Sequence, residues 1–359
     1  MGKLKDTHKM GLLFISHDLG VVGEISDHVV VMRHGEVREK APVAAIFANP
    51  QDSYTKALLA CRPSLTENPP RLMVIDDHIA GRTVHEGAGK AKDPNAPVVL
   101  KAKGLQKSFW FKEGLFGKKE FKAVKGVDFE LRKGHTLGVV GESGSGKTTM
   151  GLTLLRLHEP TGGSVMFDGQ DLLKMSGPDW QKMRRRIQVV FQNPYASLNP
   201  RFTIGQTLVE PMEIHGIGKD HAERLARATA LIQKVGLPEA ALHKYPHEFS
   251  GGQRQRIAIA RCLTLNPEVL VLDEAVSALD VSVQAQVLNL LKDLQDELGL
   301  SYIFISHDLA VVKFISDEVL VMQHGDVVEQ APVQELMANP RQEYTRKLLG
   351  AVPRGYQAA

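Results

Sequence analysis

The sequence has few cysteines and little net charge. Only two cysteines, Cys61 and Cys262, occur in 359 residues, and they are far apart and lack metal-ligand spacing. We therefore expect a reducing compartment, with both thiols as small buried apolar residues. The net charge of +3 is small and no long basic run occurs. The sequence therefore predicts no nucleic-acid partner.

Long apolar runs are also lacking. No run approaches the roughly 18 residues that a helix needs to span a bilayer. Lysines precede Gly-Leu-Leu-Phe-Ile in Met1–Leu19, but this apolar stretch is too short for a signal peptide. With 43% hydrophobic and 24% charged residues, the composition is that of a soluble globular protein. Any role at a membrane is therefore expected to be peripheral.

A glycine-rich segment fits the phosphate-loop pattern G-x-x-x-x-G-K-[ST]. An apolar strand, Leu137–Val140, is expected before it and a helix, Thr148–Leu157, after it. Stacked backbone N–H groups and the positive helix end favour phosphate, Lys147 adds charge-assisted hydrogen bonds, and the Thr148 hydroxyl is a ligand for Mg²⁺. The alternative is a plain glycine turn, which Lys-Thr at this spacing disfavours. The predicted ATP-binding residues of this loop are Gly141, Glu142, Ser143, Gly144, Ser145, Gly146, Lys147, Thr148 and Thr149.

An expected buried strand over residues 268–274 ends in two adjacent carboxylates, Asp273 and Glu274. Where a parallel strand leaves its sheet, both side chains can face the crevice in which ligands bind. We assign Asp273 to Mg²⁺, through water, and Glu274 to the general base that polarises the attacking water. The alternative is a solvated acidic pair, which the phosphate loop disfavours.

Two further polar residues follow expected strands. Gln192 follows Ile187–Phe191, and His307 follows Tyr302–Ile305. Alone, each is an ordinary polar residue at a strand end. In sequence order with the two loops above, each becomes a candidate for the same site.

A second loop lies about a hundred residues after the first, where Phe249–Arg256 reads Phe-Ser-Gly-Gly-Gln-Arg-Gln-Arg. Ser250, Gly251 and Gly252 begin an expected helix, and such a helix end is an anion site. With Gln253, this segment resembles the signature loop of the ABC ATPases. The resemblance implies an α/β fold: a P-loop NTPase (RecA-like) ABC ATPase core with an antiparallel β subdomain and a helical subdomain.

The same resemblance implies roles for the remaining polar residues. Gln192 looks like the Q-loop glutamine, which contacts metal and attacking water, and His307 looks like the switch histidine, which contacts the γ-phosphate. Ser277 and Asp280 resemble the D-loop, which runs along the interface between two cassettes. The signature loop acts in trans on ATP held by a second ABC ATPase domain, either another copy or a homologous half. One cassette alone therefore makes no complete site.

Two packing assignments accompany these roles. Phe109 matches the position where the family stacks an aromatic ring on adenine, but Trp110, Phe111, Phe116 and Phe121 are nearby alternatives. The helix after the D-loop is expected to pack through one face, formed by Val283, Val287, Leu290, Leu291, Leu294 and Leu298.

The segment Gln192–Arg201 resembles the Q-loop region of dipeptide/oligopeptide (and nickel) importer ATPases, and the tail around Tyr344 resembles their C-terminal extension. This implies a subunit that hydrolyses ATP with Mg²⁺ and energises import of peptides or similar solutes. It would act at the cytoplasmic face of the inner membrane, docking through residues 194–249 onto permease subunits, with a periplasmic or extracellular solute-binding protein as an indirect partner.

The sequence departs from the family pattern in two places. Ala275-Val276 replaces a Pro-Thr frequent in the family. The cysteine cluster of some relatives is missing, which predicts no iron–sulphur centre.

The chain also contains an unfinished repeat. Leu12–Leu59 aligns without a gap on Tyr302–Leu349, offset by 290 residues, with more than half of the positions identical. One strand, a hairpin and two short helices cannot bury enough apolar surface to fold alone. We therefore expect the first copy to be the tail of a first ATPase domain, and His17 to match a switch histidine without a phosphate loop of its own. A short appendage with a separate role is the alternative.

These observations predict five segments. Residues 1–60 are the C-terminal remnant of a first ABC ATPase domain, with its switch-histidine strand and tail, and residues 61–97 are a linker. Residues 98–330 are a complete ABC ATPase domain, with the helical subdomain at about 194–265, and residues 331–359 are the extension.

Two other functions stay open at the sequence level. A non-transport ABC protein acting on ribosomes or DNA would favour a long charged interdomain helix or a coiled-coil insertion, and neither is visible. The second open function is that of a fragment which binds nucleotide without turnover, because its cognate half is lost. The transported solute, and whether the cassette pairs with itself or with a different one, are not determined by these residues.

Overall fold

The computed structural model describes residues 7–67, 69–81, 92–113 and 117–353. Parts of three predicted segments lie outside the described residues: 1–6 of the remnant, 68 and 82–91 of the linker, and 354–359 of the extension. The alternative adenine-stacking residue Phe116 lies outside them as well. Among the described residues, no helix is long and apolar enough to cross a membrane.

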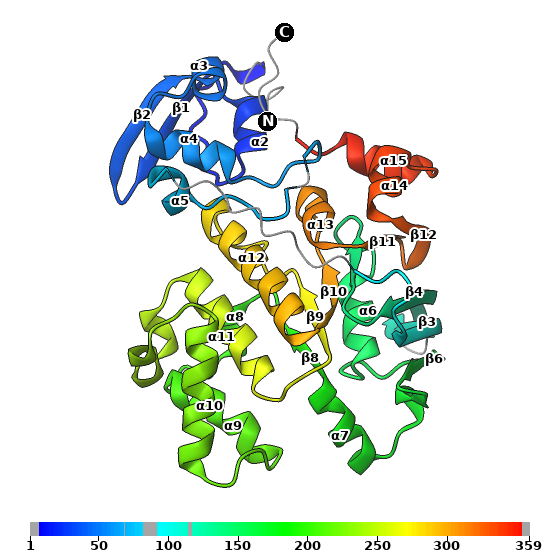
Figure 1. Ribbon diagram of the computed structural model, residues 1–359. Coiled ribbons are helices and arrows are strands. Elements are labelled where there is room, and N and C mark those ends of the chain that lie inside the picture. Colours follow the sequence, from blue (N-terminus) through cyan, green and yellow to red (C-terminus); the bar gives the residue numbers. More distant parts are fainter. Residues whose placement is uncertain (1–6, 68, 82–91, 114–116, 354–359) are drawn as a thin grey trace.

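A six-stranded sheet forms the centre of the molecule (Figure 1), in the order β12-β11-β5-β10-β9-β8. Its neighbouring strands are parallel except for the antiparallel β11–β12 pair. Every residue of β5, β9 and β10 is buried, as expected for parallel strands covered on both faces. The strands are β5 (Thr136–Val140), β8 (Ile187–Val190), β9 (Val269–Asp273), β10 (Ser301–Ile305), β11 (Glu318–Gln323) and β12 (Asp326–Pro332).

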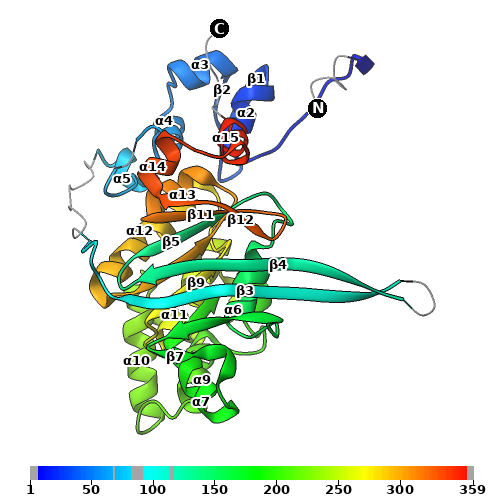
Figure 2. The ribbon, with the colours of Figure 1, turned by 90° about the vertical axis from the view of Figure 1, so that its right-hand side faces the viewer.

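A four-stranded antiparallel sheet, in the order β4-β3-β6-β7, packs over one face of the first sheet. Helix α6 (Lys147–Leu154) lies between the two sheets, and its Met150 and Leu154 are buried against both. The β3–β4 hairpin extends well beyond the other strands (Figure 2). The strands are β3 (Val98–Glu113), β4 (Gly117–Arg132), β6 (Gly162–Phe167) and β7 (Gln170–Asp171), followed by η1 (Leu172–Lys174) and α7 (Gly177–Arg186).

Helices cover the other face of the central sheet and form a separate lobe. The covering helices are α11 (Gly251–Leu263), α12 (Val281–Leu298) and α13 (Leu309–Ile315). The lobe has an apolar core of its own and consists of α8 (Pro194–Ser197), α9 (Ile204–Ile214), α10 (His221–Lys234), η2 (Glu239–His243) and η3 (Pro246–Glu248). The predicted fold class, an α/β core with an antiparallel β subdomain and a helical subdomain, is thus confirmed.

Two expected boundaries differ in the structure. Helix α6 ends at Leu154 rather than Leu157, because Arg156 adopts a left-handed backbone with φ 52° and turns the chain. Leu298 is exposed rather than packed, because it is the last residue of α12, next to the left-handed C-cap Gly299.

The N-terminal copy repeats the C-terminal elements at the same 290-residue offset. Its hairpin β1–β2 has the register of β11–β12, including the bulge at Val31/Met32, which matches Val321/Met322. Helices α2, α3 and α4 match α13, α14 (Val333–Ala338) and α15 (Glu343–Gly350), so three helices form where two were expected. The elements of the first copy are α2 (Leu19–Ile25), β1 (His28–Arg33), β2 (Glu36–Pro42), α3 (Val43–Ala48) and α4 (Ser53–Ala60).

The expected strand before His17 does not form. Residues 11–15 carry no strand, although the equivalent residues form β10. In the second copy β10 lies between β5 and β9; among the described residues the first copy has no such neighbours. A strand without pairing partners leaves its backbone polar groups unsatisfied, so the predicted switch-histidine strand was wrong.

The region expected to be a plain linker is docked where the structure describes it. Leu72 is buried in the apolar cluster of α12 and α13. Lys313 donates to the carbonyls of Leu65 and Glu67, and α5 (Ile75–Ile79) follows. This segment therefore fixes the N-terminal copy to the helices α12 and α13.

Candidate nucleotide site

The glycine-rich loop joins β5 to α6 and wraps around one lysine. Lys147 donates from Nζ to the carbonyls of Gly141 at 2.8 Å and Glu142 at 3.0 Å. Burial lowers the pKa of Lys147, while Glu274 and Asp273 oppose that shift. Gly146 has φ 103°, and a Cβ there would lie 2.4 Å from the Ala123 carbonyl oxygen, so only glycine fits. The loop thus holds a cationic group among backbone amides, an arrangement suited to polyphosphate.

A hydroxyl and a carboxylate meet at the start of α6. Thr148 Oγ1 donates to Asp273 Oδ1 at 3.0 Å. Burial raises the pKa of Asp273, and the hydrogen bond from Thr148 opposes that shift. Oxygen ligands of this kind are those that Mg²⁺ prefers. The two predicted metal-binding residues from α6 and β9 are therefore adjacent and fit the ion.

Glu274 is the point at which three strand ends converge. Gln192 Nε2 donates to Glu274 Oε2 at 2.8 Å, and His307 Nδ1 lies 3.5 Å from the same oxygen. The backbone of Glu274 is left-handed, with φ 47°, and its N–H donates to the Ile305 carbonyl at 2.9 Å. Backbone strain of this kind is concentrated at functional sites. The structure therefore brings together Glu274, Gln192 and His307.

The predicted signature loop lies away from this cluster. In Figure 1, α6 and α11 are on opposite sides of strands β8–β10. Ser250 Oγ accepts from Gln253 N–H at 3.3 Å and Gln253 Oε1 accepts from Ser250 N–H at 2.9 Å, which caps α11. Gly252 has a packing role that the sequence did not indicate, because a Cβ there would lie 1.9 Å from Val283 Cγ1. Gly251 and Gly252 thus begin a capped helix that lies across the sheet from the glycine-rich loop (Figure 1).

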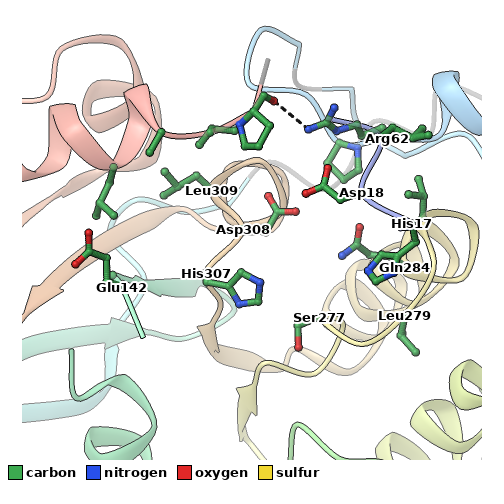
Figure 3. A pocket seen from close by; sticks show the side chains of 18 residues that line it. His17, Asp18, Arg62, Glu142, Ser277, Leu279, Gln284, His307, Asp308 and Leu309 are labelled. Carbon is green, nitrogen blue, oxygen red and sulfur yellow. Dashed lines mark hydrogen bonds between the residues drawn. The ribbon is translucent and has the colours of Figure 1, made fainter. Parts of the chain in front are cut away.

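The predicted D-loop connects Glu274 to α12. Ser277 Oγ donates to the Glu274 carbonyl at 2.9 Å, and Asp280 Oδ1 accepts from Val283 N–H at 3.1 Å. Beside this loop is a cavity of about 340 Å³ (Figure 3), which is lined by Ser277, by His307 and, from the N-terminal copy, by His17.

Phe109 is half-buried and already has two ring contacts. It packs edge-on against His158, with centroids 5.5 Å apart, and Lys107 Nζ lies 4.8 Å from its centroid. Trp110, Phe111 and Phe121 are each more than half exposed. Phe109 is thus the most enclosed of the described candidates for adenine stacking.

One residue at the site was missed by sequence reasoning. Tyr344, on α15 of the extension, accepts a hydrogen bond through its hydroxyl from Glu142 N–H at 3.1 Å. Burial raises the pKa of Tyr344. Its recurrence as Tyr54 in the first copy was visible, but the repeat did not indicate a contact with the phosphate loop.

The two sheets, the helical lobe and these loops define an ATP-binding cassette. Residues 124–277 match the family described as ABC transporter, and residues 38–87 and 328–359 match the oligopeptide/dipeptide transporter C-terminal region. The chain belongs to the ATP-binding proteins of the ABC transporter family, which confirms the resemblance seen in the sequence.

Two proteins named as glutathione import ATP-binding proteins are similar to this chain. The glutathione import ATP-binding protein GsiA of Escherichia coli K12 is 48% identical over 359 residues, covering 98% of this chain and 57% of that protein. GsiA of Salmonella paratyphi A is 47% identical over 365 residues, with the same coverage. The chain therefore spans a little over half the length of these relatives.

Solved structures of cassettes are also similar. The ATP-binding cassette MJ0796, in a dimeric post-hydrolysis state bound to ADP and Pi, has a TM-score of 0.58 and 30% identity, covering 65% of this chain and 98% of that one. The cbiO1 protein of Clostridium perfringens, part of the transporter complex cbiONQ, has a TM-score of 0.58 and 28% identity, covering 72% and 96%.

Proposed function

We propose that this chain hydrolyses ATP and thereby energises import of peptides or related small solutes through an ABC permease. The observation that carries the proposal is the convergence of Glu274, Gln192 and His307 at one oxygen, beside Lys147 and the Thr148–Asp273 pair. Phosphoryl transfer needs positioning and charge stabilisation more than covalent chemistry, and these are the groups that provide both. Relatives named for glutathione import support a peptide-like solute.

The residues divide into three roles. Residues 141–149 hold the phosphates, with Lys147 placed for the outer ones, and Phe109 stacks on adenine. Thr148, Asp273 and Gln192 would hold Mg²⁺, which supplies charge neutralisation on the phosphate oxygens. Glu274 accepts a proton from the attacking water, while Gln192 and His307 orient its carboxylate.

The signature residues Ser250, Gly251, Gly252 and Gln253 complete a site on a second cassette. They form a capped helix N-terminus, which favours an anion, and Figure 1 places that helix across the sheet from this chain's own phosphate loop. Ser277 and Asp280 then lie at the junction between the two cassettes. A second cassette is therefore a required partner.

The permease partner would dock on the helical lobe. Tyr195, Ile214 and Tyr245 are apolar or aromatic side chains exposed within residues 194–249, and aromatic anchors of this kind are typical of protein interfaces. The protein would then sit peripherally at the cytoplasmic face of the inner membrane. A solute-binding protein outside the membrane would be an indirect partner.

The N-terminal copy is proposed to be the tail of a first cassette. Val30 and Met32 of β1 are 48% and 56% exposed, whereas their equivalents in β11, Leu320 and Met322, are 0% exposed. In the second copy that face is covered because Leu320 and Met322 pack in the apolar cluster between the central sheet and the antiparallel sheet. The exposed face of β1 therefore fits the sheet of another cassette. The coding sequence upstream of the Met1 codon tests this: an in-frame phosphate loop and signature loop support it, and a stop codon opposes it.

The functional test is phosphate release with MgATP by the purified chain together with a second cassette and the permease in lipid vesicles, with the chain alone as the control. We expect Glu274→Gln to lower the rate by about 10²–10⁴-fold while MgATP binding persists, and Lys147→Ala to abolish binding. If Glu274→Gln hydrolysed ATP at the parental rate, the assignment of the general base would be wrong.

A further inference from the structure

The peptide group between Gly141 and Glu142 is held at both of its polar atoms. Its carbonyl, that of Gly141, accepts from Lys147 Nζ at 2.8 Å. Its N–H, that of Glu142, donates to the Tyr344 hydroxyl at 3.1 Å. Because a peptide group is planar, the direction of its N–H fixes the direction of its carbonyl. Tyr344 therefore helps to set where the ammonium group of Lys147 lies.

Tyr344 is in turn placed by a carboxylate on β12. Glu329 is only 8% exposed. Its Oε1 accepts from Arg341 N–H at 2.7 Å, and its Oε2 accepts from Gln342 N–H at 3.1 Å. Hydrogen bonds to a charged acceptor are among the stronger ones in proteins. Since Gln342 is the N-cap of α15, this carboxylate fixes the start of the helix two residues before Tyr344.

The hairpin that carries Glu329 also contacts the phosphate loop directly. Gly325, in the turn between β11 and β12, donates from its N–H to the Ser145 carbonyl at 2.9 Å. The turn packs closely, because a Cβ on Gly325 would lie 2.8 Å from the Ala123 carbonyl oxygen. The loop is thus held at Ser145 by the hairpin and at Glu142 by α15. A shift of α15 on the hairpin would therefore move one part of the loop relative to the other.

The first copy has the same carboxylate arrangement at a helix without a phosphate loop. Glu39 Oε1 accepts from Gln51 N–H at 2.8 Å, and Glu39 Oε2 accepts from Asp52 N–H at 3.2 Å. The tyrosine of this copy, Tyr54, lies under the Arg33 guanidinium, 4.8 Å from the ring centroid. The carboxylate arrangement therefore belongs to the repeated unit, and the first copy offers a matched control for its effect on the loop.

We propose that Glu329 is a positioning residue for ATP: it holds α15 so that Tyr344 orients the Gly141–Glu142 peptide group and, through it, Lys147. The inference rests on the proposed function, since it concerns the lysine that reaches the outer phosphates. Glu329 contacts backbone N–H groups rather than the phosphate loop, so its effect falls on ATP binding and not on the chemical step. The C-terminal extension is then part of the nucleotide site.

Amide hydrogen exchange on the full chain without nucleotide tests the connection to the loop. Glu329→Gln keeps the shape of the side chain but leaves one acceptor oxygen in place of two, and Glu39→Gln makes the same change in the first copy. We expect exchange in residues 141–147 to be about 2–10-fold faster in Glu329→Gln and at the parental rate in Glu39→Gln. Parental exchange in Glu329→Gln would overturn the proposal. So would equally fast exchange in Glu39→Gln, which would indicate general loosening.

Tyr344→Phe is the second variant for the exchange measurement. It removes the acceptor for Glu142 N–H and leaves the Glu329 carboxylate in place, so it tests the contact even where Glu329→Gln lowers the stability. We expect the same acceleration in residues 141–147, of about 2–10-fold. Parental exchange in this variant would overturn the proposed role of the hydroxyl.

Equilibrium dialysis of MgATP, on the chain with Glu274→Gln to prevent turnover, tests the effect on the nucleotide. We expect Glu329→Gln and Tyr344→Phe each to raise Kd about 2–10-fold, and the two together to raise it no further, because both act through Glu142 N–H. Effects that multiply in the double variant would overturn the shared route. Lack of binding before either change is added would contradict the proposed function, whereas binding with an unaltered Kd in Glu329→Gln would contradict only the positioning.

Discussion

The side-chain amide of Asn289 binds the backbone of Leu72 at both ends. Leu72 N–H donates to Asn289 Oδ1 at 2.9 Å, and Asn289 Nδ2 donates to the Leu72 carbonyl at 2.8 Å. Both residues are buried. Since Asn289 lies on α12, which begins directly after the D-loop, this contact ties the segment after the N-terminal copy to the helix that supports the site.

Replacing Asn289 by leucine should destabilise the protein. The change leaves the N–H and carbonyl of Leu72 buried without partners, at a cost of about 1–3 kcal/mol for each group. Urea unfolding should show a loss of roughly 2–6 kcal/mol for the two groups together. Arg71→Ala is the matched control, because its ion pair with Asp293 is 47% and 44% exposed and such pairs contribute about 0–1 kcal/mol. Equal stabilities for the two variants would refute this account.

Gly252→Ala should also lower stability, through a clash with α12. The new Cβ would lie 1.9 Å from Val283 Cγ1, and overpacking of this kind costs about 1–3 kcal/mol. Adding Val283→Ala should recover most of the loss. Gly251→Ala is the control, since its nearest neighbour, Leu279 Cδ2, is 3.8 Å away. Thermal unfolding distinguishes these cases, and a double variant no better than Gly252→Ala would rule out the clash.

Gln192→Leu should slow ATP hydrolysis more than it weakens ATP binding. The variant loses the 2.8 Å hydrogen bond to Glu274 Oε2, and a hydrogen bond to a charged group contributes about 1.5–3 kcal/mol. We expect kcat to fall about 10-fold or more, with a smaller change in KM. Gln188→Leu, on β8 and bonded to the Arg184 carbonyl, should retain the parental kcat. Equal kcat values for the two variants would argue against orientation by Gln192.

The thiol of Cys61 reports whether the N-terminal copy is docked. Burial, with smaller contributions from Asp77 and Asp76, raises the pKa of Cys61 from 9.0 to about 12. At pH 8 the reactive thiolate is then about one molecule in ten thousand, so labelling by a disulfide reagent should be very slow until the protein unfolds. Val281→Asp, which places a charge in the same cluster, should speed labelling. Fast labelling of the parental protein would contradict the burial.

The raised pKa of the Cys61 thiol should make the free energy of unfolding depend on pH. A group with a raised pKa in the folded state binds its proton more tightly there than in the unfolded chain. The stabilisation is therefore complete below pH 9 and is lost as the pH rises toward about 12. In the Cys61→Ala variant, the free energy of unfolding should fall less steeply between pH 9 and about pH 12. Urea titrations at several pH values measure this difference.

Tyr344→Phe should weaken ATP binding without changing the chemistry. It removes the acceptor for Glu142 N–H, and a single neutral hydrogen bond contributes about 0.5–1.5 kcal/mol. We expect KM for ATP to rise about 2–10-fold at constant kcat. Tyr54→Phe, the same change at the equivalent position of the first copy, is the control and should leave both constants unaltered. A fall in kcat for Tyr344→Phe would mean a role beyond loop positioning.

Local sequence patterns were sufficient for the catalytic loops. The phosphate loop, the acidic strand end and the residues Gln192 and His307 each follow a short apolar strand, and parallel strands place their carboxyl ends along one edge. Their convergence at Glu274 therefore follows from strand order alone. Distances, such as 2.8 Å from Gln192 to Glu274, required the folded chain.

The first copy shows where the sequence was misleading. Leu12–Ile15 is apolar throughout, like the equivalent residues of β10, yet it forms no strand, because strand formation depends on neighbours rather than on propensity. The hairpin β1–β2 and its bulge do form as in the second copy, because their pairing is local.

The sequence by itself determined the loops, their order and the family, since each loop is a short contiguous pattern whose geometry follows from local backbone chemistry. Only the tertiary structure decided which distant segments meet. Tyr344 reaches the phosphate loop, Asn289 holds Leu72, and Arg62 binds Pro353 beside the cavity that both copies line. Contacts such as these join residues roughly 200–290 positions apart, and no periodicity or spacing encodes them, because they depend on how complete elements pack.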